Sequence, residues 1–254
     1  MNKQPTLRSP ALQNPTRFPS RSHSRRGFTR LELCAAVTAL VALAAVCLPA
    51  LAGNKPSTDR AVCFNNLRLI GRAVDMFMAD HQETTPWRTP ESKGGTHPGA
   101  GNKPANAWSE FTFLSNNISH PRILACPADA AAKVATDFAG TPTSYSTSGM
   151  RGNATSYTLG LDIWTPTAAT LILSTDFNLR FDGRADCSAG VMNVPRIASS
   201  QPLSNQVAWT NNAHINAGQV LRIDGSVIFM DTAQLKQAMR TGDDNGSVHM
   251  LPAR

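Results

Sequence analysis

The sequence predicts an α+β fold in which a long N-terminal helix is followed by a small antiparallel β-sheet. Three observations predict this fold. Residues Leu33–Ala52 carry no formal charge, apolar side chains from Cys63 to Phe77 recur at helical spacing, and Asp224-Gly225 separates two apolar runs. We expect the first half of the helix to cross a membrane and the second half to pack on the sheet.

The uncharged stretch has the length of a membrane-spanning helix. As an α-helix, Leu33–Ala52 is about 30 Å long, which is the thickness of the hydrocarbon core of a bilayer. Pro49 is expected to bend the helix near its end. Glu32 stands one residue before the stretch, where a carboxylate is costly unless an opposite charge pairs with it.

The second half of the helix is predicted from its apolar stripe. From Cys63 the apolar positions continue with Leu67, Ile70, Val74 and Phe77, and this alternation of four and three residues marks one face of a helix. Such a face usually packs on a core.

The remaining elements are predicted from local patterns. We expect a loop over residues 82–107, a short helix over Trp108–Asn116 and a closing helix over Thr232–Met239. Strands are expected at Pro121–Asp129, Ser144–Ser146, Ser156–Leu161 and Leu171–Ser174, and a hairpin at Gln219–Met230. A two-residue type I′ turn at Asp224-Gly225 would pair Ile223 with Ser226 and Leu221 with Ile228.

The excess of positive charge lies at the N-terminus. The chain has 24 basic and 17 acidic residues, but residues 1–27 hold six of the basic residues and no acidic one, which leaves 18 against 17. Basic residues before a membrane helix favour the cytoplasmic side. The near-neutral remainder offers no basic patch that would follow a phosphate backbone, so we expect no nucleic-acid partner.

The residues before the apolar stretch, RRGFTRLEL at positions 25–33, resemble the cleavage signal of type IV pilin-like proteins. In that family a prepilin peptidase cuts after a glycine and methylates the new N-terminus. The resemblance makes Gly27 the last leader residue, Phe28 the first residue of the mature chain and Glu32 its fifth. Arg30 departs from the pattern, because that position is usually apolar.

The resemblance also implies a role for Glu32. Cleavage after Gly27 would create a free ammonium group at Phe28. Within a filament, the ammonium group of a neighbouring copy would neutralise the Glu32 carboxylate. In this interpretation Glu32 sets the register between subunits and has no catalytic role.

Later segments resemble pseudopilins, the branch of the same family that serves type II secretion. The matching segments are Cys63–Arg68, Cys126–Asp129, Asp176–Leu179, and Asp224–Val227 with His214 and Gly218 before it. The expected domains are a basic leader (1–27), an apolar helix (28–53), an amphipathic helix (54–82) and a β-rich pseudopilin-like domain (83–254).

The resemblance implies a structural subunit and not an enzyme. It would be processed by prepilin peptidase and held in the inner membrane by a single helix, with its C-terminal domain in the periplasm. Other pseudopilin subunits would join it in a short periplasmic filament of a type II secretion-type system. One alternative is a pilin for adhesion or DNA uptake.

Another alternative is an export signal. Ser24–Arg30 also resembles a twin-arginine signal, and Ala50–Ala52 could be cut by a signal peptidase. The product would then be a soluble periplasmic binding protein or enzyme that begins at Gly53. The pseudopilin resemblance of the later segments favours the pilin-like interpretation.

The chain contains five cysteines. Cys34 and Cys47 lie in the apolar stretch, whereas Cys63, Cys126 and Cys187 lie beyond it. An oxidising compartment permits one disulfide among the last three, and Cys63 with Cys126 is a possible pair, although spacing does not select it. Buried free thiols are the alternative.

No catalytic or metal site is expected. His214, Asp224 and a serine are the parts of a hydrolase triad, but the sequence has no Gly-x-Ser-x-Gly elbow. Residues Asp243–Gly246 offer oxygen ligands for calcium, although a solvated turn is the preferred interpretation. Zinc-ligand spacing and dinucleotide fingerprints are absent from the sequence. We therefore expect no cofactor, with calcium as the alternative.

Overall fold

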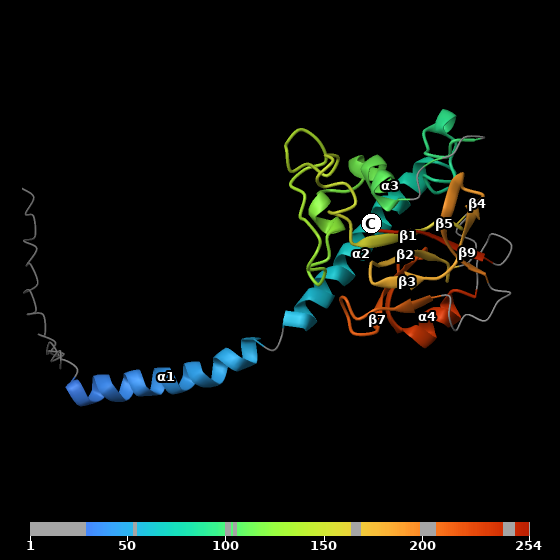
Figure 1. The fold of residues 1–254 in the computed structure, drawn as a ribbon. Coiled ribbons are helices and arrows are strands. Elements are labelled where there is room, and N and C mark those ends of the chain that lie inside the picture. The colour runs from blue at the N-terminus through green and yellow to red at the C-terminus, as the bar shows by residue number, and fades with distance from the viewer. Residues whose placement is uncertain are drawn as a thin grey trace, which may run out of the picture. The chain divides into compact units, whose positions relative to one another are not determined.

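The computed structural model describes residues 29–52, 55–99, 103, 106–163, 169–198, 207–240 and 247–253 (Figure 1). The chain divides into two compact units with the boundary between Ala50 and Leu51, and each unit is described by itself. The helices are α1 (Arg30–Ala52), α2 (Lys55–Asp80), α3 (Ala107–Phe113) and α4 (Thr232–Ala238), with 3-10 turns η1 (Glu91–Lys93), η2 (Leu114–Asn116) and η3 (Pro121–Leu124). The strands are β1 (Tyr157–Gly160), β2 (Ile172–Asp176), β3 (Leu179–Phe181), β4 (Arg184–Cys187), β5 (Val191–Ala198), β6 (Val207–Trp209), β7 (Ala217–Arg222), β8 (Val227–Asp231) and β9 (Ser247–Leu251).

Helix α1 exposes its apolar side chains. Leu31, Leu33, Leu40, Val41 and Leu43 are between 59% and 80% exposed. Because alanine, leucine and valine occur at nearly every position, and not at every third or fourth, the helix has no polar face beyond its first turn.

The membrane prediction is corrected by the structure. Within the described residues, no helix is long and apolar enough to cross a membrane. The prediction of a single-pass inner-membrane protein with its C-terminal domain in the periplasm is therefore wrong.

The predicted fold class, a long N-terminal helix on a small antiparallel sheet, is also wrong. The helical region is two elements, since α1 ends at Ala52 and α2 begins at Lys55. Pro56 falls in the first turn of α2, where proline starts a helix but would break the interior of a longer one. The sheet is large: seven strands pair antiparallel in the order β4-β5-β9-β1-β2-β7-β8.

Both faces of the sheet are covered, which explains why its middle strands are apolar at successive positions. Adjacent side chains of a strand point to opposite faces. The residues of β2, β7 and β9 divide accordingly into two cores: Leu173, Leu221 and Leu251 on one face, and Ile172, Val220 and Met250 on the other.

One layer is α2, which packs on β2, β7 and β8 (Figure 1). Its predicted apolar stripe is confirmed, because Cys63, Leu67, Ile70, Val74 and Phe77 are all buried in the core. The opposite layer is formed by α4 and by the two-stranded sheet of β3 and β6. The amphipathic helix and the β-rich region belong to one compact unit.

The predicted hairpin exists, but its register is shifted by one residue. Leu221 pairs with Val227 and Val220 with Ile228. Gly225 has a positive φ of 78°, and its N–H donates to the carbonyl of Arg222, so the connection is a three-residue loop and not a two-residue turn. The loop is fixed by the Asp224 carboxylate, which accepts the N–H of Ser226 at 2.8 Å.

Of the other local predictions, some are confirmed and some are wrong. The short helix after Trp108, the apolar strand at Leu171–Ser174 and the closing helix are confirmed as α3, β2 and α4. The predicted strand at Pro121 is instead the turn η3, because His120 caps it by accepting the N–H of Arg122 and proline favours the first helical position. Residues 144–146 lie in turns.

Gly218 on β7 is required by Trp209 on β6, since a Cβ at this position would collide with the indole ring. We expect Gly218→Ala to lower the free energy of unfolding by about 1–3 kcal/mol, the usual cost of overpacking a core. Gly149→Ala is the matched control, because nothing lies within 4 Å of its Cβ position. Urea unfolding of both variants checks this, and equal stability of the two would contradict the packing described.

Candidate functional site

Several residues predicted to be functional lie outside the described residues. These are Gly27 and Phe28 at the expected cleavage site and the stretch Asp243–Gly246, where calcium ligands were considered. Glu32, Cys63 and Cys126 are described. They occupy two separate places in the chain: Glu32 lies in the first turn of α1, and the two cysteines lie in the globular unit.

Glu32 is bound locally by Thr29 in a capping box. The Thr29 backbone N–H donates to Glu32 Oε2 at 2.8 Å and its hydroxyl donates to the same oxygen at 3.0 Å. In return the Glu32 N–H donates to Thr29 Oγ1 at 3.2 Å. The backbone bond, and then the hydroxyl bond, hold the pKa of Glu32 below its usual value. The Thr-x-x-Glu spacing at residues 29–32 is the sequence signature of this motif, so the cap was predictable from the sequence.

A disulfide joins α2 to the segment that follows η3. It links Cys63 to Cys126, whose Cα atoms are 5.3 Å apart, and both cysteines are buried. Closing the loop between them stabilises the fold by about 4 kcal/mol in the chain-entropy model. Among the described cysteines, Cys34 and Cys187 are free thiols.

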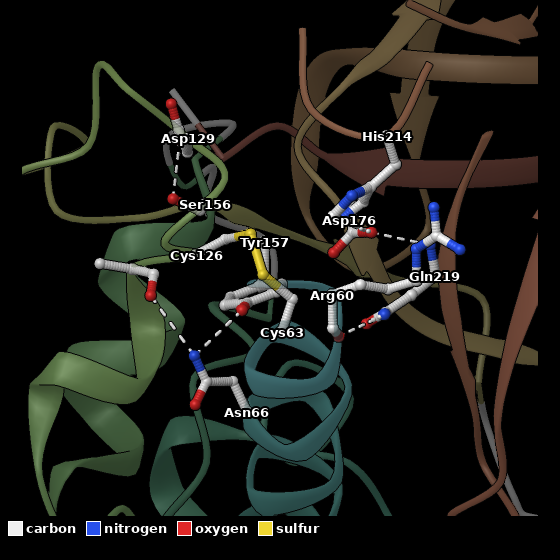
Figure 2. The surroundings of a disulfide bond; sticks show 11 residues. Arg60, Cys63, Asn66, Cys126, Asp129, Ser156, Tyr157, Asp176, His214 and Gln219 are labelled. Carbon is white, nitrogen blue, oxygen red and sulfur yellow. Dashed lines mark hydrogen bonds and ion pairs between the residues drawn. A yellow bond between two sulfur atoms is a disulfide. The ribbon is translucent and has the colours of Figure 1, made fainter. Parts of the chain in front are cut away.

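Hydrogen bonds surround the disulfide and join the same segments (Figure 2). Asn66, one turn after Cys63 on α2, donates to the Ala125 carbonyl at 3.3 Å and to the Tyr157 hydroxyl at 3.2 Å. Ser156 donates to Asp129 at 2.7 Å. The disulfide is therefore part of a buried polar junction between α2, the Cys126 segment and β1.

His214 and Asp176 lie on the sheet side of this junction (Figure 2). His214 Nε2 is 3.5 Å from Asp176 Oδ2, and both side chains are buried. Asp176 also accepts the Gln219 backbone N–H at 2.7 Å, while the Gln219 side chain donates to the Arg60 carbonyl on α2 at 2.7 Å. Within the described residues, Asp176 Oδ1 and His214 Nε2 have no hydrogen-bond partner.

Burial controls the charge of this pair. It raises the pKa of Asp176 to about 7, although the Gln219 N–H lowers it. Burial and then the nearby positive charge of Arg60 lower the pKa of His214. His214 thus lies next to Asp176 and not next to Asp224, which remains in the β7–β8 loop. The residues considered for a hydrolase triad are not brought together.

A second buried polar cluster centres on Asp162, just after β1. Arg88 Nη2 lies 3.4 Å from Asp162 Oδ1, and His249 Nδ1 of β9 lies 3.0 Å from the same oxygen. Arg88 also donates to the Leu161 carbonyl at 2.8 Å. The Cys187 thiol at the end of β4 is 3.7 Å from Asp162. Sequence reasoning missed this cluster, because its members are far apart in the chain and belong to no motif.

The second cluster resembles an activated cysteine, in which a nucleophile, a base and an orienting carboxylate lie together. Cys187, however, is only 6% exposed. The cluster therefore ties the loop after α2 to strands β1, β4 and β9, and we assign it a stabilising role.

Two groups of side chains have the ligand atoms and spacing to hold a metal. One consists of Cys63, Cys126 and His214, and the other of Asp162, Cys187 and His249; within each group the ligand atoms lie within 4.8 Å of one another. In the second group the Arg88 guanidinium already binds the carboxylate, which disfavours another cation. In the first group the two sulfurs are bonded to each other.

Comparison with known proteins gives no relative: no protein-family model, no curated protein and no solved structure matches the chain. A functional proposal therefore depends on the residues themselves.

The second cluster predicts a pH-dependent stability. Burial opposes protonation of His249, but its bonds to Asp162 and Cys187 outweigh burial and raise its pKa from 6.5 to about 9, even with Arg88 nearby. A raised folded-state pKa stabilises the fold fully below pH 6.5, and this stabilisation is lost as the pH rises through about 9. We expect a loss of up to about 3 kcal/mol across that range.

Urea unfolding on either side of this range measures the effect. His249→Gln should flatten the pH profile. Cys187→Ser removes the thiol contact of the imidazole, and the slope due to Asp162 should persist in this variant. Parallel profiles for the wild type and His249→Gln would contradict the assignment.

Proposed function

We propose that this chain is a pseudopilin-like structural subunit that is processed after Gly27 and assembles through α1 with further copies into a short filament of a type II secretion-type system. The observation that carries the proposal is the exposed apolar surface of α1. The proposed partners are a prepilin peptidase and other subunits of the same kind.

Burial of the α1 surface supplies the driving force for assembly. Fully burying one leucine or valine side chain stabilises a complex by about 1.5–3 kcal/mol, and α1 exposes five such residues at 59% or more. Alanines between them, such as Ala35, Ala36, Ala39 and Ala42, let neighbouring helices approach closely. A second copy of α1 offers the same uninterrupted apolar surface, so copies of this chain fit the surface better than a partner with a polar face.

The capping box is compatible with the role proposed for Glu32. Both bonds from Thr29 reach Oε2, and the residue is exposed. A carboxylate with exposed lone pairs can accept hydrogen bonds from the ammonium group of a neighbouring copy. The globular unit carries a disulfide, which supports assembly in an oxidising compartment.

Processing is tested by sequencing the N-terminus of the mature chain. We expect an N-methylated Phe28, and we expect Gly27→Ala to leave an uncut precursor, because the peptidase requires the glycine. A mature chain that begins at Gly53 would instead indicate an exported soluble protein and would refute the proposal.

The role of Glu32 in assembly is tested against its role in capping. Glu32→Ala removes both the cap and the exposed carboxylate, whereas Thr29→Val removes only the hydroxyl bonds and keeps the carboxylate. We expect both variants to be cleaved, Glu32→Ala to form few filaments and Thr29→Val to form them nearly normally. Sedimentation and electron microscopy measure the yield. Equal losses in the two variants would show that Glu32 acts only as a helix cap.

A further inference from the structure

The disulfide junction contains a feature that the proposed assembly does not use. A ring nitrogen of His214 lies within 4.8 Å of the sulfurs of both Cys63 and Cys126. All three residues are buried. Nε2 of His214 faces Asp176 Oδ2 at 3.5 Å, and Asp176 Oδ1, in the described part of the chain, lacks a hydrogen-bond partner. An incompletely satisfied histidine–carboxylate pair is costly in a protein interior, and its presence beside two sulfurs points to a ligand.

We propose that reduction of the Cys63–Cys126 disulfide creates a zinc-binding site, in which both thiolates and His214 bind the metal and Asp176 orients the imidazole. The site exists in one redox state only. In the oxidised state the two sulfurs form the disulfide. In both states α2 and the segment that follows η3 remain joined. This proposal goes beyond the filament function and does not depend on it.

The geometry of the backbone suits this exchange. Two thiolates on one tetrahedral zinc lie about 3.8 Å apart, given Zn–S distances of about 2.3 Å. The two cysteine Cα atoms are 5.3 Å apart, which places both side chains within reach of one ion. Cys63 is fixed on α2, and His214 is fixed next to β2 by its contact with Asp176.

The chemistry of the ligands selects zinc. Soft thiolates with imidazole favour Zn²⁺ over calcium or magnesium, which take oxygen ligands. Two thiolates neutralise the charge of the ion, so the loaded centre is neutral and suited to a buried position. A carboxylate beside the imidazole is the common partner of a zinc-bound histidine, and Asp176 Oδ2 lies 3.5 Å from His214 Nε2.

The redox step balances with an external reductant. A phosphine gives two electrons that break the S–S bond and is converted to its oxide with oxygen from water, while each sulfur takes up a proton. Zinc binding then releases the two thiol protons. A hollow lined by Asn66, Cys126 and Asp129, among others, lies beside the disulfide on its Cys126 side.

The test is titration of the full chain with Co²⁺, a spectroscopic substitute for zinc, before and after reduction with a phosphine. We expect one equivalent to bind the reduced chain, with thiolate charge-transfer and tetrahedral d–d bands that zinc abolishes, and no binding to the oxidised chain. Loss of the bands is expected in Cys63→Ser and Cys126→Ser. Asp176→Asn should keep the spectrum but weaken binding roughly 10–100-fold.

Matched controls use the other free thiols. Cys34→Ser and Cys187→Ser should bind cobalt like the wild type, because neither residue belongs to the site. The proposal is overturned if reduced wild type shows no thiolate band, or if a variant lacking both Cys63 and Cys126 keeps it. X-ray absorption at the zinc edge of reduced wild type gives a measurement without mutation. Two sulfur ligands with at least one nitrogen support the site, and any other sulfur count refutes it.

Discussion

The packing of α2 on the seven-stranded sheet is the interaction on which the described globular unit depends. The apolar stripe of the helix lies on β2, β7 and β8, and the approach is close, because a Cβ at Gly71 would lie 3.2 Å from Leu221. The Cys63–Cys126 disulfide fixes one end of this contact, and the bond from Gln219 to the Arg60 carbonyl adds a link to the sheet. With its other face covered by α4, β3 and β6, the sheet is buried on both sides, which is unusual for antiparallel strands.

The two N-terminal helices differ in what covers them. Helix α2 has one apolar face and buries it within its own chain. Helix α1 is apolar around its circumference, and its described leucines and valines are exposed. An apolar surface of this extent on a single helix indicates an interaction site. This division is the basis of the proposal that α1 serves assembly while the globular unit is stable by itself; in that proposal Glu32, which caps the helix, also pairs with a neighbouring copy.

Sequence was informative where structure follows from local periodicity and failed where it follows from distant contacts. The α2 stripe from Cys63 to Phe77 and the apolar strand at Leu171 were predictable, since both patterns reflect a face that must be buried. The size of the sheet was not, because β4, β5 and β9 have weak patterns and because β9 pairs with β5 across about fifty residues and with β1 across about ninety. The hairpin register failed by one residue because a type I′ turn needs a positive φ at both central residues, and of Asp224 and Gly225 only Gly225 has one. The Asp176–His214 and Asp162–His249 contacts join residues far apart in the chain.

The central claim is that α1 is covered by other copies of this chain. Cys34 reports on it directly, because its thiol lies on α1 and is exposed. The measurement is the alkylation rate of Cys34 in the mature chain, in a Cys47→Ser background. It is made at protein concentrations below and above the concentration at which the chain assembles. We predict that assembly slows alkylation at least about tenfold, since buried thiols are inert. An unchanged rate in assembled protein would contradict the account.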